Sequence, residues 1–299
     1  MRKLLVLLTI AALALAACGK PAKRTTAEPA PSTEAPSVEP LPSTPAVSAS
    51  PSASPKASRK ASPKPSSTLK KTVSAGGDTG SAKAPTNDGV PAKGAGTFTG
   101  ASGGTDVVGT GATLVKYRVE VEDGIPWGSN PVWTPASFAA TVDEVIAGNR
   151  SWIRSAESPV TDAAESMAGA SWSFQRVSGT DYSVRVRLAT PDTVDKLCGS
   201  VGVKTQGVYS CRFGQTLMIN LRRWLHGAPN FPVSITSYRN NVINHEMGHF
   251  LGFDHMHCPA AGQPAPIMMQ QTINIEGCLP NEFPFAADGT FVMGAWAPS

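Results

Sequence analysis

The sequence predicts an α+β domain that follows a long segment without a hydrophobic core. Residues 19–111 consist largely of Pro, Ala, Ser, Thr, Lys and Gly, and they contain almost no aliphatic clusters. Residues 114–122 alternate apolar and polar side chains with the period of a half-buried strand. Two later stretches, 134–148 and 236–251, repeat apolar residues at helical spacing instead. Strand and helix patterns therefore occur only in the second part of the chain.

Further elements are expected between the two helices. Thr134 is placed as an N-cap, and Pro135 occupies the first helical position, where a missing N–H costs nothing. Residues 172–177 and 182–188 alternate again on either side of a Ser-Gly-Thr-Asp turn, which predicts a β-hairpin. Residues 217–221 are expected to form another short strand.

Residues 1–17 have the features of an export signal. Arg2 and Lys3 precede an apolar run that is too short to span a bilayer as a mature helix. The run ends in Leu-Ala-Ala-Cys18, which resembles the lipobox of bacterial lipoproteins, whose cysteine is acylated and becomes the new N-terminus. An ordinary secretory signal with a chance cysteine is the alternative. Both interpretations place the mature protein outside the cytoplasm, and the lipobox implies a lipoprotein of the cell envelope, anchored to the membrane through Cys18.

Residues 18–111 are predicted to be a disordered tether, and residues 112–299 the folded domain. The tether cannot bury enough apolar surface to offset the conformational entropy of folding. It carries eleven Lys or Arg against six Asp or Glu, whereas the domain carries thirteen against sixteen. The net charge of +4 therefore reflects the tether and the signal, and we expect no nucleic-acid partner. The basic tether is either a solvated spacer or a contact for anionic polymers or headgroups.

Four cysteines remain in the predicted domain. An even set of thiols in an oxidising compartment tends to pair, and four cysteines allow three connectivities. The local pairing, Cys198–Cys211 and Cys258–Cys278, closes the shortest loops. Each bridge contributes roughly 3 kcal/mol in the loop-entropy model. A tetrathiolate zinc site is the alternative, but the chain contains no CxxC pair.

The sequence HEMGHFLGFDH begins at His245. On a helix His245 and His249 lie one turn apart on the same side, so both imidazoles reach a single metal ion. Gly252 ends the helix, because glycine tolerates the left-handed backbone, and His255 returns as a third ligand. Three neutral imidazoles suit Zn²⁺ and leave a fourth position for water. Glu246, on the adjoining flank, is predicted to be the catalytic general base.

This constellation predicts a zinc metallopeptidase. Zinc polarises the scissile carbonyl and lowers the pKa of a bound water toward about 7. Glu246 takes the proton of that zinc-bound water and returns it to the leaving amine. His257, two residues beyond the third ligand, is expected to be either exposed or a supporting partner behind the ligands.

The HExxHxxGxxH pattern resembles the metzincin clan of zinc endopeptidases. The resemblance implies a twisted mixed sheet with a backing helix and an active-site helix, followed by a small irregular C-terminal subdomain. It also implies a methionine in a tight turn beneath the zinc, and Pro-Ile-Met268 fits the clan's pattern better than Met269 does. Several metzincins carry a tyrosine two residues later that stabilises the tetrahedral intermediate. This chain has Gln270 there, so stabilisation falls to zinc alone or to an amide.

Residues 238–244 and 268–272 are also similar to an uncharacterised family of exported bacterial metzincin-like domains. These resemblances imply a monomer that cleaves peptide or protein substrates at the cell envelope, and a Cys258–Cys278 bridge would clamp both walls of its site. Two other functions stay open: a zinc-holding pseudoenzyme or adhesion domain, and a peptidase that cleaves cross-links of wall polymers. Glu246 argues against the pseudoenzyme, because a structural zinc site does not need it.

Overall fold

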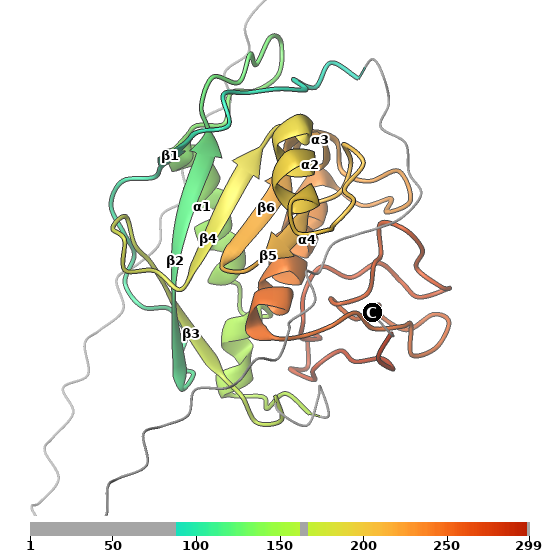
Figure 1. The fold of residues 1–299 in the computed structure, drawn as a ribbon. Coiled ribbons are helices and arrows are strands. Elements are labelled where there is room, and N and C mark those ends of the chain that lie inside the picture. Colours follow the sequence, from blue (N-terminus) through green and yellow to red (C-terminus); the bar gives the residue numbers. More distant parts are fainter. Residues whose placement is uncertain (1–87, 162–166, 298–299) are drawn as a thin grey trace, which may run out of the picture. The chain divides into compact units, whose positions relative to one another are not determined.

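The computed structural model describes residues 88–161 and 167–297 (Figure 1). The expected export signal, the lipidation site Cys18 and residues 18–87 of the expected tether lie outside the described residues. Among the helices that are described, none combines the length and the apolar character needed to cross a membrane.

A mixed six-stranded sheet organises the domain, with strand order β1-β2-β4-β6-β5 and β3 paired to β2 as well. The central pairs β2–β3, β2–β4 and β4–β6 are parallel, whereas β1 and β5 pair antiparallel with β2 and β6. The expected α+β class with a mixed sheet is thereby confirmed. The strands are β1 (Phe98–Gly100), β2 (Thr113–Glu122), β3 (Trp172–Arg176), β4 (Val184–Ala189), β5 (Cys211–Phe213) and β6 (Thr216–Asn220).

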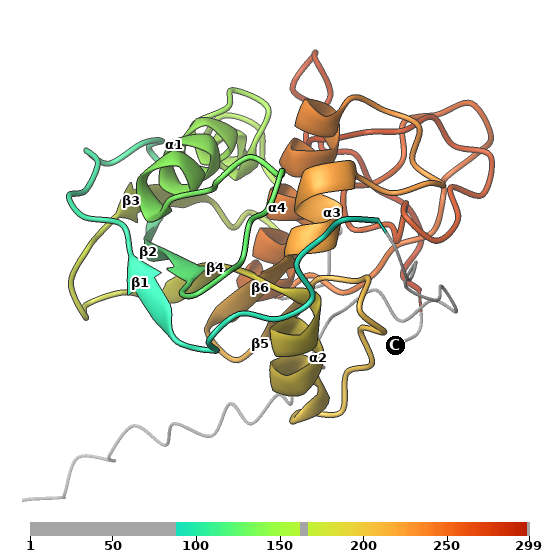
Figure 2. The ribbon, with the colours of Figure 1, turned by 90° about the horizontal axis from the view of Figure 1, so that it is seen from above.

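Helices cover both faces of this sheet. Figures 1 and 2 show α1 and α4 on one face and α2 on the other. The helix α1 begins where predicted, because the Thr134 side chain accepts a hydrogen bond from the Ser137 N–H and caps the first turn. The helices are α1 (Pro135–Ile146), the short 3₁₀ helix η1 (Trp152–Ala156), α2 (Pro191–Gly199), α3 (Leu221–His226) and α4 (Ile235–Leu251).

The main core lies between the sheet and the helices α1 and α4. The alternation predicted for the first strand places Val115, Tyr117, Val119 and Val121 in this core. Phe138 of α1 is fully buried, and its ring meets Trp224 edge-on with 4.9 Å between ring centroids. Apolar burial of this kind is the main source of folding free energy.

A smaller core lies between α2 and the opposite face of the sheet. Val194 of α2 packs there with Met218 of β6, beside the Cys198–Cys211 disulfide. Met218 points to this face because its neighbours Leu217 and Ile219 belong to the main core. The second disulfide, Cys258–Cys278, is also present, so both predicted pairings are confirmed.

The hairpin predicted from residues 172–188 is wrong. Both strands run parallel to β2: β3 pairs with residues 113–117 and β4 with residues 117–121. The two strands of a hairpin run antiparallel, so they cannot both be parallel to the same third strand. The short turn does not reverse the chain but carries it onward along β2.

The folded domain also begins earlier than the predicted boundary at Ala112. β1 precedes that boundary and pairs with residues 120–122 of β2. Ala101 is buried, and its N–H donates to the carbonyl of Val119. Residues 88–111 therefore belong to the fold, although their composition resembles that of the tether before them.

After α4 the described chain contains no further helix or strand. Isolated bridges join Met256 to Trp296, Pro264 to Leu279 and Phe285 to Phe291. The Cys258–Cys278 disulfide closes a loop of this segment. Residues 252–297 are thus ordered by cross-links rather than by regular secondary structure.

Replacing Phe138 with alanine should destabilise the domain by about 3–5 kcal/mol, because a fully buried ring leaves a cavity. Val132→Ala is the control, since Val132 is 62% exposed and its loss should cost within about 0.5 kcal/mol. Urea denaturation followed by tryptophan fluorescence measures both. Equal midpoints for the two variants would contradict the position of the main core.

Candidate metal centre

The motif residues lie on the last turns of α4, which is buried on nearly all sides. Glu246 is 1% exposed, and His249 is 3% exposed. The apolar residues Ile243 and Met247 face the main core as predicted, but the opposite side of the helix is covered as well. Gly252 ends the helix with φ +110°, the left-handed conformation that was expected of it.

Three imidazoles converge beyond the end of this helix. His249 Nε2 lies 3.1 Å from His245 Nε2 and 3.2 Å from His255 Nε2. One ring nitrogen from each residue lies within 4.8 Å of the others, which is close enough for all three to hold one metal ion. The three histidines predicted as ligands are therefore brought together.

Backbone carbonyls orient two of these rings. His245 Nδ1 lies 2.8 Å from the Ile267 carbonyl oxygen, and His249 Nδ1 lies 2.9 Å from that of Phe253. A carbonyl oxygen only accepts, so each Nδ1 carries the hydrogen and each neutral ring turns its Nε2 lone pair into the cluster. Two lone pairs facing each other at 3.1 Å repel, and a shared cation would remove that repulsion.

Burial keeps His249 in the form that binds metals. Removal from water lowers the pKa of His249 well below its usual value, and the nearby His245, His255 and Arg212 lower it further. The Phe253 carbonyl acts in the opposite direction, because it accepts the ring hydrogen. His249 is consequently a neutral imidazole at pH 7, as a metal ligand must be.

Met268 packs against the helix that carries the first two histidines. It is fully buried, and its Sδ packs directly against Gly248, the residue before His249. Its carbonyl accepts the N–H of Met256, which lies next to His255. Met269 packs elsewhere, in a small cluster with the Cys258–Cys278 disulfide. Of the two methionines considered, only Met268 contacts the ligand-bearing helix at Gly248.

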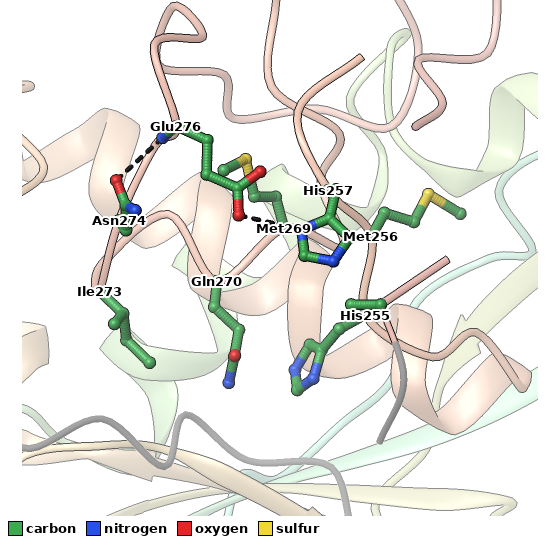
Figure 3. A pocket seen from close by; sticks show the side chains of 9 residues that line it. His255, Met256, His257, Met269, Gln270, Ile273, Asn274 and Glu276 are labelled. Carbon is green, nitrogen blue, oxygen red and sulfur yellow. Dashed lines mark hydrogen bonds and ion pairs between the residues drawn. The ribbon is translucent and has the colours of Figure 1, made fainter. Parts of the chain in front are cut away.

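A pocket of about 130 Å³ adjoins the third histidine. His255 and Gln270 both line it and point to the same side in Figure 3. Gln270 thus lies next to the cluster, as its place in the sequence implied. Met256, Met269, Ile273 and Asn274 line other parts of the pocket.

His257 is not part of the cluster. Its side chain is 48% exposed, and its Nδ1 lies 2.9 Å from Glu276 Oε1 (Figure 3). This hydrogen bond and one from the Cys258 N–H lower the pKa of Glu276. Glu276 has φ +48°, an uncommon backbone for glutamate, and its N–H donates to Asn274 Oδ1. His257 is therefore an exposed residue that ties two loops at the rim of the pocket.

Asparagines on α4 hold the segment that follows the site. Asn241 Nδ2 donates to the carbonyl of Asn281, and Asn244 Nδ2 donates to that of Glu282. Asn244 also accepts from Ser151 Oγ, and its carbonyl accepts from Trp152 Nε1. These bonds satisfy polar groups that the burial of α4 removes from water.

Arg212 is a residue of the site that sequence reasoning missed. It lies on β5, is 6% exposed, and donates from Nη2 to the backbone carbonyl of His249 at 2.9 Å. Burial lowers the pKa of its guanidinium, whereas the nearby carboxylates of Glu246 and Asp254 favour its charged form. No motif signalled it, because it precedes His249 by 37 positions.

The fold and the site define a mixed-sheet α+β domain with a buried histidine cluster at the end of its longest helix. The chain matches the family model described as "Protein of unknown function (DUF3152)" over residues 84–293, and it belongs to that family. The match begins before Ala112, in agreement with the earlier start of the fold. No curated protein and no solved structure matches the chain.

Gly248→Ala should destabilise the domain by about 1–3 kcal/mol, because overpacking displaces buried side chains. An added Cβ would lie 2.8 Å from Trp152 Cζ2 and even closer to Met268 Sδ. Gly199→Ala is the matched control, since nothing lies within 4 Å of a Cβ there and its effect should stay within about 1 kcal/mol. Urea midpoints decide between them, and an unperturbed Gly248→Ala protein would contradict the close packing of Met268.

Proposed function

We propose that this domain is a zinc-dependent metallopeptidase of the metzincin type. The observation that supports this best is the convergence of three histidine nitrogens, together with the buried carboxylate of Glu246, which follows His245 in the sequence and is not a member of the cluster. A purely structural zinc site has no use for such a carboxylate and usually closes its fourth position with another side chain. The cluster found among the described residues has three members, so a position for water is available.

The donor set fits zinc. Two nitrogen ligands at about 2.0–2.1 Å from one tetrahedral zinc ion lie roughly 3.3 Å apart. His249 Nε2 lies 3.1 and 3.2 Å from its two neighbours, which is close to this separation. Zinc held by His245, His249 and His255 would act as a Lewis acid that activates water and polarises the scissile carbonyl.

The protein itself supplies proton transfer and orientation. Glu246 follows the first ligand on α4, and its carboxylate accepts the proton of the attacking water and returns it to the leaving amine. The carbonyls of Ile267 and Phe253 keep the imidazoles in the tautomer that binds metal. Met268 is proposed as the methionine of the metzincin turn, and the Gln270 amide as a donor to the developing oxyanion.

Location outside the cytoplasm completes the proposal. Two disulfides in one domain are typical of proteins that fold in an oxidising compartment. With a lipid anchor on Cys18 and a tether behind it, the domain would act on peptides or proteins at the cell envelope as a monomer. The cleavage of wall-polymer cross-links is the second candidate substrate class, and it uses the same chemistry.

Purified protein should contain one zinc ion per chain by mass spectrometry of metals. Zinc added to the chelator-treated protein should raise its unfolding temperature, because a ligand at 100 times its Kd stabilises by about 2.7 kcal/mol. His255→Ala should abolish both effects, whereas His226→Ala, an exposed histidine on α3, should preserve them. Equal metal content in the two variants would exclude the histidine cluster as the zinc site.

Glu246→Ala should keep zinc but lose at least about 100-fold in turnover, because general acid–base catalysis contributes factors of that size. A peptide-library digest read by mass spectrometry measures the loss, with Glu144→Ala, an exposed glutamate of α1, as control. If neither peptides nor cross-linked wall fragments are cut by the zinc-loaded wild-type protein, the peptidase proposal fails and the binding-domain alternative gains.

A further inference from the structure

The turn between the second and third histidines is held from outside the motif. His249 ends the ligand pair on α4, and His255 follows after the left-handed Gly252. The turn between them has few internal bonds: the Gly252 N–H reaches the carbonyls of Gly248 and His249, and the Phe253 N–H reaches that of Gly248. The His249 ring is also bonded within this turn, because its Nδ1 donates to the Phe253 carbonyl, whereas the Gly252 and Phe253 N–H bonds do not involve His255.

Arg212 is bonded to the first residue of this turn. Its Nη2 donates to the His249 carbonyl at 2.9 Å, and its charge interacts with the carboxylates of Asp254 and Glu246. His249 begins the turn and Asp254 immediately precedes His255. One guanidinium is therefore bonded to the backbone of one ligand, and its charge acts on the carboxylate that precedes the next ligand.

The position of Arg212 is itself fixed. It belongs to β5, which pairs with β6, and the preceding residue Cys211 is joined to Cys198 of α2. Burial of a cation costs free energy unless charges and acceptors nearby offset it. The domain nevertheless keeps Arg212 6% exposed beside the histidine cluster. A surface-exposed lysine would suffice if only the helix terminus needed a positive charge.

We propose that Arg212 is a positioning residue of the metal centre, which ties the turn from His249 to His255 to the edge strand β5 and so sets the spacing of these two ligands. The inference deepens the proposed function, because it concerns the same site. It does not require peptidase activity, since ligand spacing governs metal affinity whether or not a substrate is cleaved.

Arg212→Met provides the test, and Arg223→Met is its matched control. Arg223 is also 6% exposed and also donates to a backbone carbonyl, that of Gly227, but it lies on α3, and its cation–π contact is with Tyr209 rather than with a residue of the histidine cluster. The probe is Zn²⁺ alone, titrated against a competing chelator. We expect Arg212→Met to weaken zinc binding about 10–100-fold, the usual effect of losing a group that orients ligands. Arg223→Met should stay within about twofold of the wild type.

Three further readouts separate positioning from general destabilisation. Urea unfolding of the metal-free proteins should show similar losses for both variants, and the absorption bands of bound Co²⁺ should shift only in Arg212→Met. Arg212→Lys should restore part of the affinity, and it replaces Arg212→Met as the test variant if the latter does not fold. Affinity and Co²⁺ spectra equal to the wild type, or an equal loss in Arg223→Met, would overturn the proposal. A wild-type protein that binds zinc but cleaves nothing would contradict the proposed peptidase activity. The comparison of zinc affinities between the two arginine variants would still test the role of Arg212.

Discussion

The arrangement of the histidine cluster depends on two hydrogen bonds between imidazole Nδ1 atoms and backbone carbonyls. These carbonyls belong to Ile267 and Phe253, which lie outside α4. The helix brings His245 and His249 to one side, but a helix alone leaves each ring free to rotate about its side-chain torsions. The two carbonyls fix the tautomer and the orientation of each ring. The irregular segment after the helix supplies both carbonyls, so it decides which nitrogen of each ring faces the cluster. This explains why a segment without regular secondary structure is so extensively cross-linked.

Burial of α4 on nearly all sides gives the site its low-dielectric surroundings. It also costs free energy, because polar side chains of the helix are removed from water. A surface helix hides one apolar stripe, whereas here Asn241, Asn244, Glu246 and the histidines are buried together with Ile243 and Met247. The asparagines recover hydrogen bonds with the backbone of residues 281–282. Gly248 lets Met268 approach the helix closely. The contacts that provide hydrogen bonds and packing for the buried helix therefore also hold Met268 and residues 281–282 next to the site.

Features that depend on residues close in sequence could be predicted, and those that depend on distant residues could not. The N-cap of α1, the glycine that ends α4, the spacing of His245 and His249 and the local disulfides follow from patterns within a few turns of chain. The pairing of β3 and β4 with β2 is a tertiary choice, and the intervening turn gave a misleading local signal. Residues 88–111 contain few apolar side chains, and their order comes from pairing with β2 rather than from a core of their own. Arg212 approaches His249 only because β5 lies against α4, which no motif encodes.

The two disulfides also bear on which atoms compete for a metal ion. Cys258 lies three residues beyond His255, and Cys211 is the neighbour of Arg212. As free thiols these residues would offer soft thiolate ligands close in the chain to His255 and to Arg212, and zinc binds thiolates readily. Paired with Cys278 and Cys198, they carry no thiolate. For the proposed zinc site, the two disulfides would thus leave imidazole nitrogen as the donor and would prevent sulfur from closing the fourth coordination position.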